Sequence, residues 1–364
     1  MKKTFRILTI NPGSTSTKIA LFENENRVFE EVLRHRPEEI SRFKGTLDQY
    51  QWRKDVVLEA LKRHGVDLGT LDAVVGRGGL LPPLESGTYR VNQEMLDYLR
   101  NPNRERTHPS DLGAMIAYEI ASPLGIPAFI VDPVSVDEFD PLARISGLPE
   151  IERKSLSHAL NLKAMARRAA KDLGREYHEV NLVVTHMGGG ISVSAHRKGR
   201  MIDVNQALDG TGPFSPERAG GLPVGDVLRL AYSGKYTYEQ LFRRITKEGG
   251  LLAHLGTNDA REVERRIEAG DRKAALVYEA MAYQIAKEIG GMATTLKGDV
   301  DAVVLTGGLA HSKMLVGWIK ERTEWIAPVL VYPGEDELLS MAQGALRVLT
   351  GKEAAKEFSI AARK

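Results

Sequence analysis

The chain has 364 residues, of which 42% are hydrophobic and 27% are charged, and its formal net charge is +2. This length and composition are typical of a globular protein of about two domains with a sizeable buried core. Cysteine is absent, which excludes disulfides, iron–sulfur ligation, zinc ribbons and cysteine nucleophiles. Nucleic-acid-binding proteins usually have a basic stripe with interleaved aromatic residues, and the sequence contains none.

The N-terminal segment places lysines before an apolar stretch, as a signal peptide does. That stretch spans only residues 5–10 and is interrupted by Arg6 and Thr9, so it is too short for a signal peptide. No apolar run approaches the ~20 residues needed to cross a bilayer. We therefore expect a cytoplasmic protein with no membrane contact.

Short apolar runs that end in turn residues alternate with longer stretches of helical spacing. This alternation predicts an α/β fold. The expected strands are 7–10, 73–75, 129–131, 182–185, 302–305 and 329–332, and the main expected helices are 156–173, 274–296 with an interruption at Gly290-Gly291, and 337–362. Turns at strand ends are where α/β proteins bind ligands, although most such turns carry no chemistry.

Two segments share one layout. Residues 7–22 and residues 182–196 each contain an apolar strand, a polar residue, a glycine turn, a small hydroxyl residue and a second apolar strand. They lie almost half the chain apart. This similarity indicates two related domains, each with one phosphate-facing hairpin, unless it arose by chance.

The first hairpin turn combines the groups that bind phosphate. Residues 11–18, Asn-Pro-Gly-Ser-Thr-Ser-Thr-Lys, contain a glycine, several hydroxyls and a lysine. Strand alternation places Ser14, Ser16 and Lys18 on one face. The alternative interpretation is a plain hairpin turn with solvated hydroxyls.

Two further glycine turns follow predicted strands. Gly188-Gly189-Gly190 comes after His186 and predicts a second phosphate cradle, because successive glycines favour a close backbone neighbour. Gly307-Gly308 either contacts a nucleotide or only ends a strand. Neither a Walker motif nor a G-x-G-x-x-G motif occurs, which disfavours P-loop and Rossmann nucleotide binding.

Nine segments, in order, resemble the acetate and butyrate kinase family: NPGSTSTK, VVGRGG, RTHPSDLG, FIVDP, ERKSLSHALN, THMGGGISV, TNDAR, LTGGLAHS and YPGEDEL. The resemblance covers essentially the whole chain, and residues 152–159 and 213–218 point to the butyrate branch. It implies the actin-like ATPase fold, with two duplicated ribonuclease-H-like α/β domains and a cleft between them. We expect the N-terminal domain at 1–150, completed by a C-terminal helix 343–364, and the nucleotide-binding domain at 151–342.

The resemblance also implies roles for particular residues. Arg77 matches an arginine that orients the carboxylate and steadies the transferring phosphoryl group, and Asp132 matches an aspartate near the magnesium ion. His108, His158 and His186 match histidines that line the cleft, and His158 is taken as catalytic. The implied Mg²⁺ residues are Asn11, Asp336 and Glu337, and the implied nucleotide residues are Asn11, Ser14, Ser16, Lys18, His186, Gly188, Gly189, Gly190, Asp226, Asn258, Asp259, Arg261, Gly307 and Gly308.

Three departures from the acetate kinase pattern put acetate in doubt as the substrate. Gly189 stands in place of an asparagine, and Lys154 stands in place of a histidine. The family's second catalytic arginine falls near Pro223, so Arg218 is the substitute candidate. Lys154 and Arg218 are accordingly predicted to supply positive charge beside the phosphoryl group.

The implied function is ATP-dependent phosphorylation of butyrate, or of a branched relative such as isobutyrate, to an acyl phosphate. The reaction is reversible with ADP, and its cofactors are ATP/ADP and Mg²⁺. The resemblance further implies a homodimer or larger homo-oligomer. The alternatives are an acetate or propionate kinase, and a non-catalytic actin-like module that binds ATP.

Overall fold

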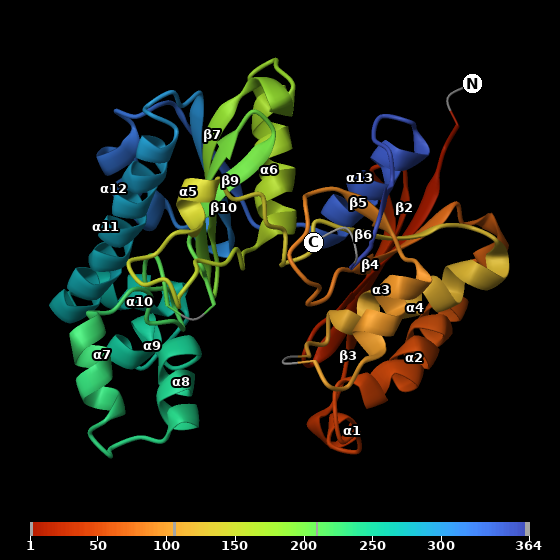
Figure 1. The fold of residues 1–364 in the computed structure, drawn as a ribbon, viewed down its shortest axis with the longest axis horizontal. Coiled ribbons are helices and arrows are strands. Elements are labelled where there is room, and N and C mark those ends of the chain that lie inside the picture. The colour runs from red at the N-terminus through yellow and green to blue at the C-terminus, as the bar shows by residue number, and fades with distance from the viewer. Residues whose placement is uncertain (1–2, 105–106, 209, 361–364) are drawn as a thin grey trace. The chain divides into compact units, whose positions relative to one another are not determined.

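The computed structural model describes residues 3–104, 107–208 and 210–360. These residues form two compact units (Figure 1). Unit 1 comprises the chain up to Val136 together with the chain from Asp336 onward, and unit 2 runs from Asp137 to Glu335. The expected domain limits at 150 and 342 lie 14 residues beyond the first of these crossings and 7 residues beyond the second. No helix in the described ranges is long and apolar enough to cross a membrane.

Unit 1 contains a mixed sheet with strand order β12-β5-β6-β4-β1-β2-β3. Its strands are β1 (Arg6–Pro12), β2 (Ser16–Glu23), β3 (Asn26–Arg34), β4 (Ala73–Arg77), β5 (Thr88–Arg90), β6 (Ala128–Val131) and β12 (Lys356–Glu357). Its helices are α1 (Pro37–Ile40), α2 (Tyr50–Arg63), α3 (Gln93–Arg100), α4 (Asp111–Ala121) and α13 (Glu337–Leu349).

Unit 2 contains a second mixed sheet with strand order β11-β10-β7-β8-β9. Its strands are β7 (Asn181–Met187), β8 (Ile191–Arg197), β9 (Arg200–Val204), β10 (Ala302–Gly307) and β11 (Val329–Pro333). Its helices are α5 (Pro141–Arg144), α6 (Ala159–Asp172), α7 (Val224–Ala231), α8 (Tyr238–Thr246), α9 (Gly250–Leu255), α10 (Ala260–Glu268), α11 (Arg272–Thr295) and α12 (Lys313–Thr323).

The two sheets share one topology. In unit 1, β1, β2 and β3 form an antiparallel meander, and β4 and then β6 add in parallel beside β1. In unit 2, β7, β8 and β9 form the same meander, and β10 and then β11 add in parallel beside β7. The α/β fold is therefore confirmed, and the two segments of similar sequence are the β1–β2 and β7–β8 hairpins.

All six expected strands are present, but the expected helices need correction. The helix expected at 156–173 is α6, which begins later, at Ala159, with His158 as the residue that precedes its first turn. The predicted interruption at Gly290-Gly291 is wrong, since α11 runs continuously through both glycines. The C-terminal helix ends at Leu349 rather than near 362, because Gly351 adopts a positive φ of 74° and residues 356–357 then pair with β5. Residues 361–364 lie outside the described residues.

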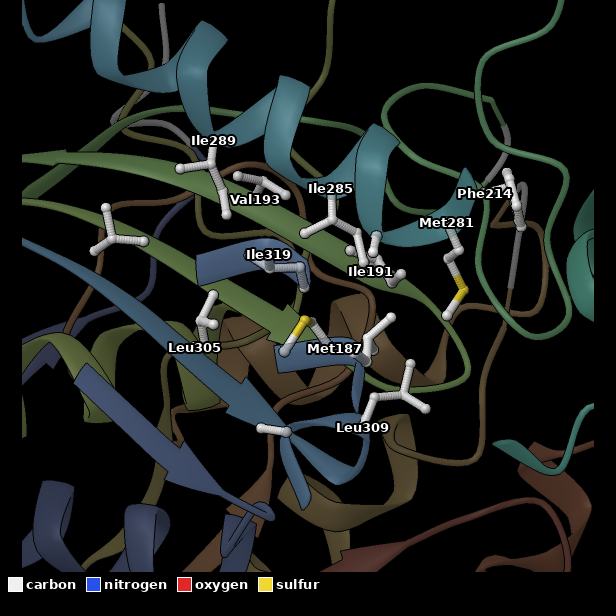
Figure 2. Packing of buried hydrophobic residues seen from close by; sticks show 14 of the residues in the cluster. Met187, Ile191, Val193, Phe214, Met281, Ile285, Ile289, Leu305, Leu309 and Ile319 are labelled. Carbon is white, nitrogen blue, oxygen red and sulfur yellow. The ribbon is translucent and has the colours of Figure 1, made fainter. Parts of the chain in front are cut away.

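The core of unit 2 lies between its sheet and helix α11. Figure 2 shows Ile285 and Ile289 of α11 packing over Ile191 and Val193 of β8, and Met187 at the end of β7 belongs to the same buried cluster. Successive residues of a strand point to opposite faces. His186 therefore points to the other face of the sheet, where α6 packs.

In unit 1, helices cover both faces of the sheet. Gly76 of β4 lies directly against Gly113 of α4, where an added Cβ would come within 2.1 Å of the Gly113 carbonyl oxygen. The next position points to the opposite face, because Arg77 is paired with Val131, which contacts Gly344 of α13. Backbone contact with α4 on one face thus fixes where Arg77 emerges on the other.

Candidate functional site

Asn11, Arg77 and Glu337 come together in unit 1, at the ends of β1 and β4 and the start of α13. Asn11 Nδ2 donates to Glu337 Oε2 at 2.6 Å, and Arg77 Nε lies 3.4 Å from Glu337 Oε1. The Arg77 side chain is 8% exposed, and its buried Nη1 has no hydrogen-bond partner in the described part of the chain. An unsatisfied buried donor costs about 1–3 kcal/mol. The arrangement therefore indicates a site for an oxygen acceptor such as a carboxylate or phosphate.

Asp132 follows β6 directly, and its backbone φ is +38° although it is not glycine. The residue is only 1% exposed, and its Oδ1 accepts hydrogen bonds from Ser86 Oγ at 2.6 Å and from the Gly87 amide at 2.8 Å. Strained conformations of this kind concentrate at functional sites, where the surrounding structure holds them in place. Because β4 and β6 are parallel neighbours, Asp132 and Arg77 stand at the ends of adjacent strands.

Asp336 and Glu337, the acidic pair predicted to bind Mg²⁺, make different contacts. Asp336 Oδ1 caps α13 by accepting from the Leu339 amide at 2.9 Å, and its Oδ2 forms an ion pair with Arg27. Glu337 instead faces Asn11. Within the described ranges, no group of three or more histidine, cysteine or acidic side chains is arranged to hold a metal. The residues fit a Mg²⁺ ion that takes one carboxylate and Asn11 from the protein and its other ligands from phosphates and water.

The β1–β2 turn presents the predicted hydroxyl and lysine side chains. Ser14 and Lys18 are exposed and Ser16 is half-buried, whereas Thr17 between them is buried. The side chain that binds the carbonyls of this turn is Arg53 of α2, a residue that sequence reasoning missed. No local pattern distinguishes it from the other charged residues of an amphipathic helix.

His108 lies beside the Arg77 group. Its Nδ1 is 2.8 Å from Ser110 Oγ. Burial lowers the pKa of His108 below its ordinary value, the Asp111 carboxylate opposes this shift, and the Arg77 guanidinium adds to it. A neutral imidazole near Arg77 leaves the positive charge of the arginine available to an anion.

In unit 2, His158 and His186 stack with their ring centroids 4.0 Å apart and their planes 17° apart. His158 Nδ1 lies 2.9 Å from Ser192 Oγ, and His186 Nδ1 lies 3.0 Å from Asn161 Oδ1. An amide oxygen only accepts, so this contact places a proton on His186 Nδ1 and leaves its Nε2 as an acceptor or as the site of a second proton. Both rings lie beside the β7–β8 turn, since a Cβ added at Gly188 would come within 3.1 Å of His186 Nε2 and one at Gly190 within 3.3 Å of His158 Cε1.

Gly188-Gly189-Gly190 forms the β7–β8 turn, and Arg218 lies directly against it. An added Cβ at Gly190 would come within 2.2 Å of Arg218 Nη1. The glycine run was predicted to have a close backbone neighbour, whereas the atoms nearest to Gly190 belong to a side chain. Ser215 Oγ donates to the Gly189 carbonyl at 2.5 Å, and Arg218 donates to the Ala207 carbonyl. Burial lowers the pKa of Arg218, and the Glu217 carboxylate opposes that shift.

Glu217 is a second residue that sequence reasoning missed. Its Oε1 accepts from Asn258 Nδ2 at 2.7 Å, and its Oε2 would lie 3.6 Å from a Cβ at Gly189. It thereby joins one predicted nucleotide residue to the glycine turn. Its place next to Arg218, in the segment already singled out, was the available signal.

Gly307 and Gly308, at the end of β10, have different surroundings. A Cβ at Gly307 would come within 2.4 Å of the Met187 carbonyl oxygen, so Gly307 packs the end of β10 against the end of β7. A Cβ added at Gly308 would meet no described atom within 4 Å, and this residue begins a short 3-10 turn. Gly307 therefore has a packing role beside the β7–β8 turn.

Four predicted residues of unit 2, namely Lys154, Asp226, Asp259 and Arg261, make no hydrogen bond or ion pair with these side chains in the part of the chain that the structure describes. Lys154 is exposed and makes no side-chain hydrogen bond or ion pair in the described ranges. Asp226 pairs with Arg229 on exposed α7. Asp259 caps α10 by accepting from the Arg261 amide, and the two side chains also form an exposed ion pair at 3.0 Å. Their predicted roles in catalysis and nucleotide binding stay predictions.

Residues 152–319, all within unit 2, match the model of the acetokinase family. Three solved structures share the fold. Acetate kinase from Porphyromonas gingivalis is 20% identical, with 95% of this chain and 100% of that chain aligned at a TM-score of 0.77. A propionate kinase from Francisella tularensis subsp. tularensis SCHU S4 is 20% identical, with 93% and 98% aligned at a TM-score of 0.71. Acetate kinase from Entamoeba histolytica is 16% identical, with 95% and 100% aligned at a TM-score of 0.76.

Proposed function

We propose that the chain is a member of the acetokinase family and transfers the γ-phosphoryl group of ATP to the carboxylate of a short-chain fatty acid. The proposed substrate is butyrate or a branched relative such as isobutyrate, and the reaction also runs from acyl phosphate and ADP toward ATP. The proposed enzyme acts in the cytoplasm as a homodimer or larger homo-oligomer. The family match over residues 152–319 supports the reaction class.

The observation that carries the proposal is the buried Arg77 guanidinium with an unmet donor. Its Nε faces Glu337, whereas its Nη1 has no acceptor in the described part of the chain. A planar guanidinium matches the geometry of a carboxylate or a phosphate. An anionic substrate would complete this hydrogen bonding.

The proposed chemistry requires positioning and charge neutralisation rather than a general base. A carboxylate oxygen is already a nucleophile, so it forms a bond to the γ-phosphorus while the bond from that phosphorus to the ADP oxygen breaks. No proton moves in this step. Arg77 and Arg218 are the candidate cations for the charge on the transferring group, which is the main demand of phosphoryl transfer.

Asn11 and Glu337 would hold the Mg²⁺ that accompanies ATP. When bound, the ion neutralises phosphate charge and orients the phosphoryl group. Asn11 Nδ2 donates to Glu337, which fixes the amide orientation and leaves Asn11 Oδ1 as its remaining oxygen. A carboxylate and an amide oxygen are ligands that Mg²⁺ accepts.

Trapping of the acyl phosphate as a hydroxamate, with ATP, Mg²⁺ and a panel of acids from two to five carbons, tests this function. We expect kcat/KM to be highest for butyrate or isobutyrate, since each methylene in an apolar pocket changes selectivity by roughly 1–3 kcal/mol. A maximum at acetate or propionate would replace the proposed substrate. ATP hydrolysis that no acid alters, without hydroxamate, would indicate the non-catalytic ATP-binding module instead.

A further inference from the structure

Arg53 of α2 carries a buried positive charge. Its exposed fraction is 0%, and its Nε and Nη2 donate to Gln49 Oε1 at 3.0 and 2.8 Å. No carboxylate among the described residues forms an ion pair with it. Burial lowers the pKa of Arg53 to about 10, so the guanidinium remains charged near neutral pH. Burying an uncompensated charge is costly, and this position needs a physical reason.

The remaining hydrogen bonds of Arg53 go to the β1–β2 turn and to Thr17 Oγ1 of β2, which lies 3.2 Å from Nη1. Its Nη1 donates to the carbonyls of Gly13 at 2.8 Å and Ser16 at 3.2 Å, and its Nη2 donates to the carbonyl of Ser14 at 3.3 Å. The fourth carbonyl of the turn, that of Thr15, accepts from the backbone amide that follows β3 at 2.9 Å. Every carbonyl of residues 13–16 is therefore bound to the protein.

The amides of the same turn are available. The Gly13 amide donates to the Ser16 carbonyl at 2.7 Å, but the amides of Ser14 and Thr15 donate to no group in the described chain, and both residues are exposed. Consecutive free amides in a turn form an anion-binding concavity. A fixed cation on the carbonyl side of the turn strengthens its attraction for an anion.

We infer that Arg53 is a positioning residue that turns the β1–β2 hairpin into a polyphosphate-binding turn, by holding its carbonyls inward and by placing a permanent positive charge behind its free amides. The identity of the polyphosphate as that of ATP rests on the proposed function. The turn itself recognises the phosphate chain, so inorganic tripolyphosphate is a ligand of the same chemistry.

The competing explanation is that Arg53 only joins α2 to the hairpin. A purely structural role would change stability without a selective effect on anions. The informative variants are therefore Arg53→Met, which removes the charge at similar length, and Arg53→Lys, which keeps the charge but loses the fork. Arg63→Met is the matched control, because Arg63 lies on the same helix with a 56% exposed side chain paired with Glu31.

The experiment measures tripolyphosphate and ATP binding by calorimetry, and KM for each substrate, in variants with native circular dichroism. We expect Arg53→Met to raise both dissociation constants about tenfold or more, Arg53→Lys to raise them less, and Arg63→Met to leave them within twofold, since an ionic hydrogen bond is worth about a factor of ten or more. The KM for ATP should rise in parallel while the KM for the acid stays unchanged.

A folded Arg53→Met variant that binds tripolyphosphate as tightly as the wild type would overturn the inference. If wild type binds tripolyphosphate but shows no kinase activity, the proposed function fails and the inference stands. Should both Arg53 variants fail to fold, Gln49→Leu decides, because it removes the acceptor that orients the guanidinium. Unchanged tripolyphosphate affinity in that variant would also overturn the inference.

Discussion

The β1–β2 and β7–β8 hairpins occupy equivalent places in the two sheets but hold their turns by different means. In unit 1, Arg53 binds the turn carbonyls, and the turn contains a single glycine. In unit 2, three glycines form the turn, and the Ser215 hydroxyl donates to the Gly189 carbonyl. Each turn also has an internal backbone hydrogen bond, from the Gly13 amide to the Ser16 carbonyl at 2.7 Å and from the Gly188 amide to the Gly190 carbonyl at 3.0 Å. Two hairpins with a similar sequence pattern are therefore stabilised by different side-chain contacts.

The glycines of the two turns differ in their physical reason. A Cβ at Gly13 would make only an ordinary contact, 3.5 Å from the Ser16 carbonyl oxygen. At Gly190 it would overlap the guanidinium of Arg218. Gly13 is thus replaceable in terms of space, whereas Gly190 makes room for a cation. A glycine in a turn motif has to be judged by its neighbours.

The largest expected effect separates the two candidate arginines. Arg77 Nη1 has no acceptor among the described residues, whereas Arg218 donates to the Ala207 carbonyl. We expect Arg77→Ala to lower kcat about 10³-fold, the effect of an arginine that acts on the transferring phosphoryl group. Arg218→Ala should lower it about tenfold, consistent with a less direct role. Steady-state kinetics with ATP and the best acid measure both.

Arg90→Ala serves as the control for this pair. Arg90 lies in unit 1 with a side chain that is 51% exposed and 3.9 Å from Glu357. Its activity should match that of the wild type. Equal losses in the Arg77 and Arg218 variants would remove the distinction between the two arginines.

Both hairpins should lose stability at low pH, because each has a buried neutral histidine beside a buried cation. Burial, and then Arg53, lowers the pKa of His35 from 6.5 to about 4. A histidine whose folded pKa is depressed stabilises the fold fully above pH 6.5, and this stability is lost as the pH falls toward 4. The size of the loss is about 3 kcal/mol. Burial, and then Lys163 and Arg167, likewise lowers the pKa of His196 in unit 2.

Urea unfolding at pH 7 and pH 4.5 measures this effect. Wild type should lose about 2–3 kcal/mol more than His35→Gln between these values, since glutamine cannot titrate. His196→Gln tests the same effect in unit 2. If wild type and both variants lost stability equally, the histidines would not be responsible for the acid sensitivity.

The smallest expected effect compares glycines. Gly190→Ala should displace Arg218 and raise the KM for ATP about tenfold, equivalent to about 1.4 kcal/mol. Gly13→Ala should change it less than twofold, because the added methyl group meets no short contact. Thermal unfolding of both variants separates this effect from loss of the fold. A larger effect at Gly13 than at Gly190 would reverse the comparison.

The sequence predicted the fold well where hydrophobic burial determines it. The six apolar runs are strands because they are buried on both faces or paired within the sheet. The errors concern helix ends. Gly290-Gly291 remains helical because Ile289 and Met292 on either side are buried, which offsets the weak helix preference of glycine. After Gly351, pairing of residues 356–357 with β5 replaces the expected helical continuation.

The candidate site was partly predictable because strand ends collect ligand-binding residues. Asn11, Arg77 and Glu337 lie in contact, and so do His158 and His186, although their roles stay predictions. The contacts of Arg53 were not predictable, since they join residues about 40 positions apart and depend on how α2 packs against a turn. The exposure of Lys154 likewise follows from a loop whose path no local pattern determines.

The backbone contact between Gly76 and Gly113 has a consequence for how this protein tolerates mutation. Peptide groups of β4 and α4 touch without an intervening side chain, and an added Cβ at Gly113 would in turn come within 2.6 Å of the Arg77 carbonyl oxygen. Repacking elsewhere in that layer therefore leaves the origin of the Arg77 side chain unmoved. We therefore expect the position of Arg77 to tolerate substitutions elsewhere in the sequence, provided that Gly76 and Gly113 remain glycine.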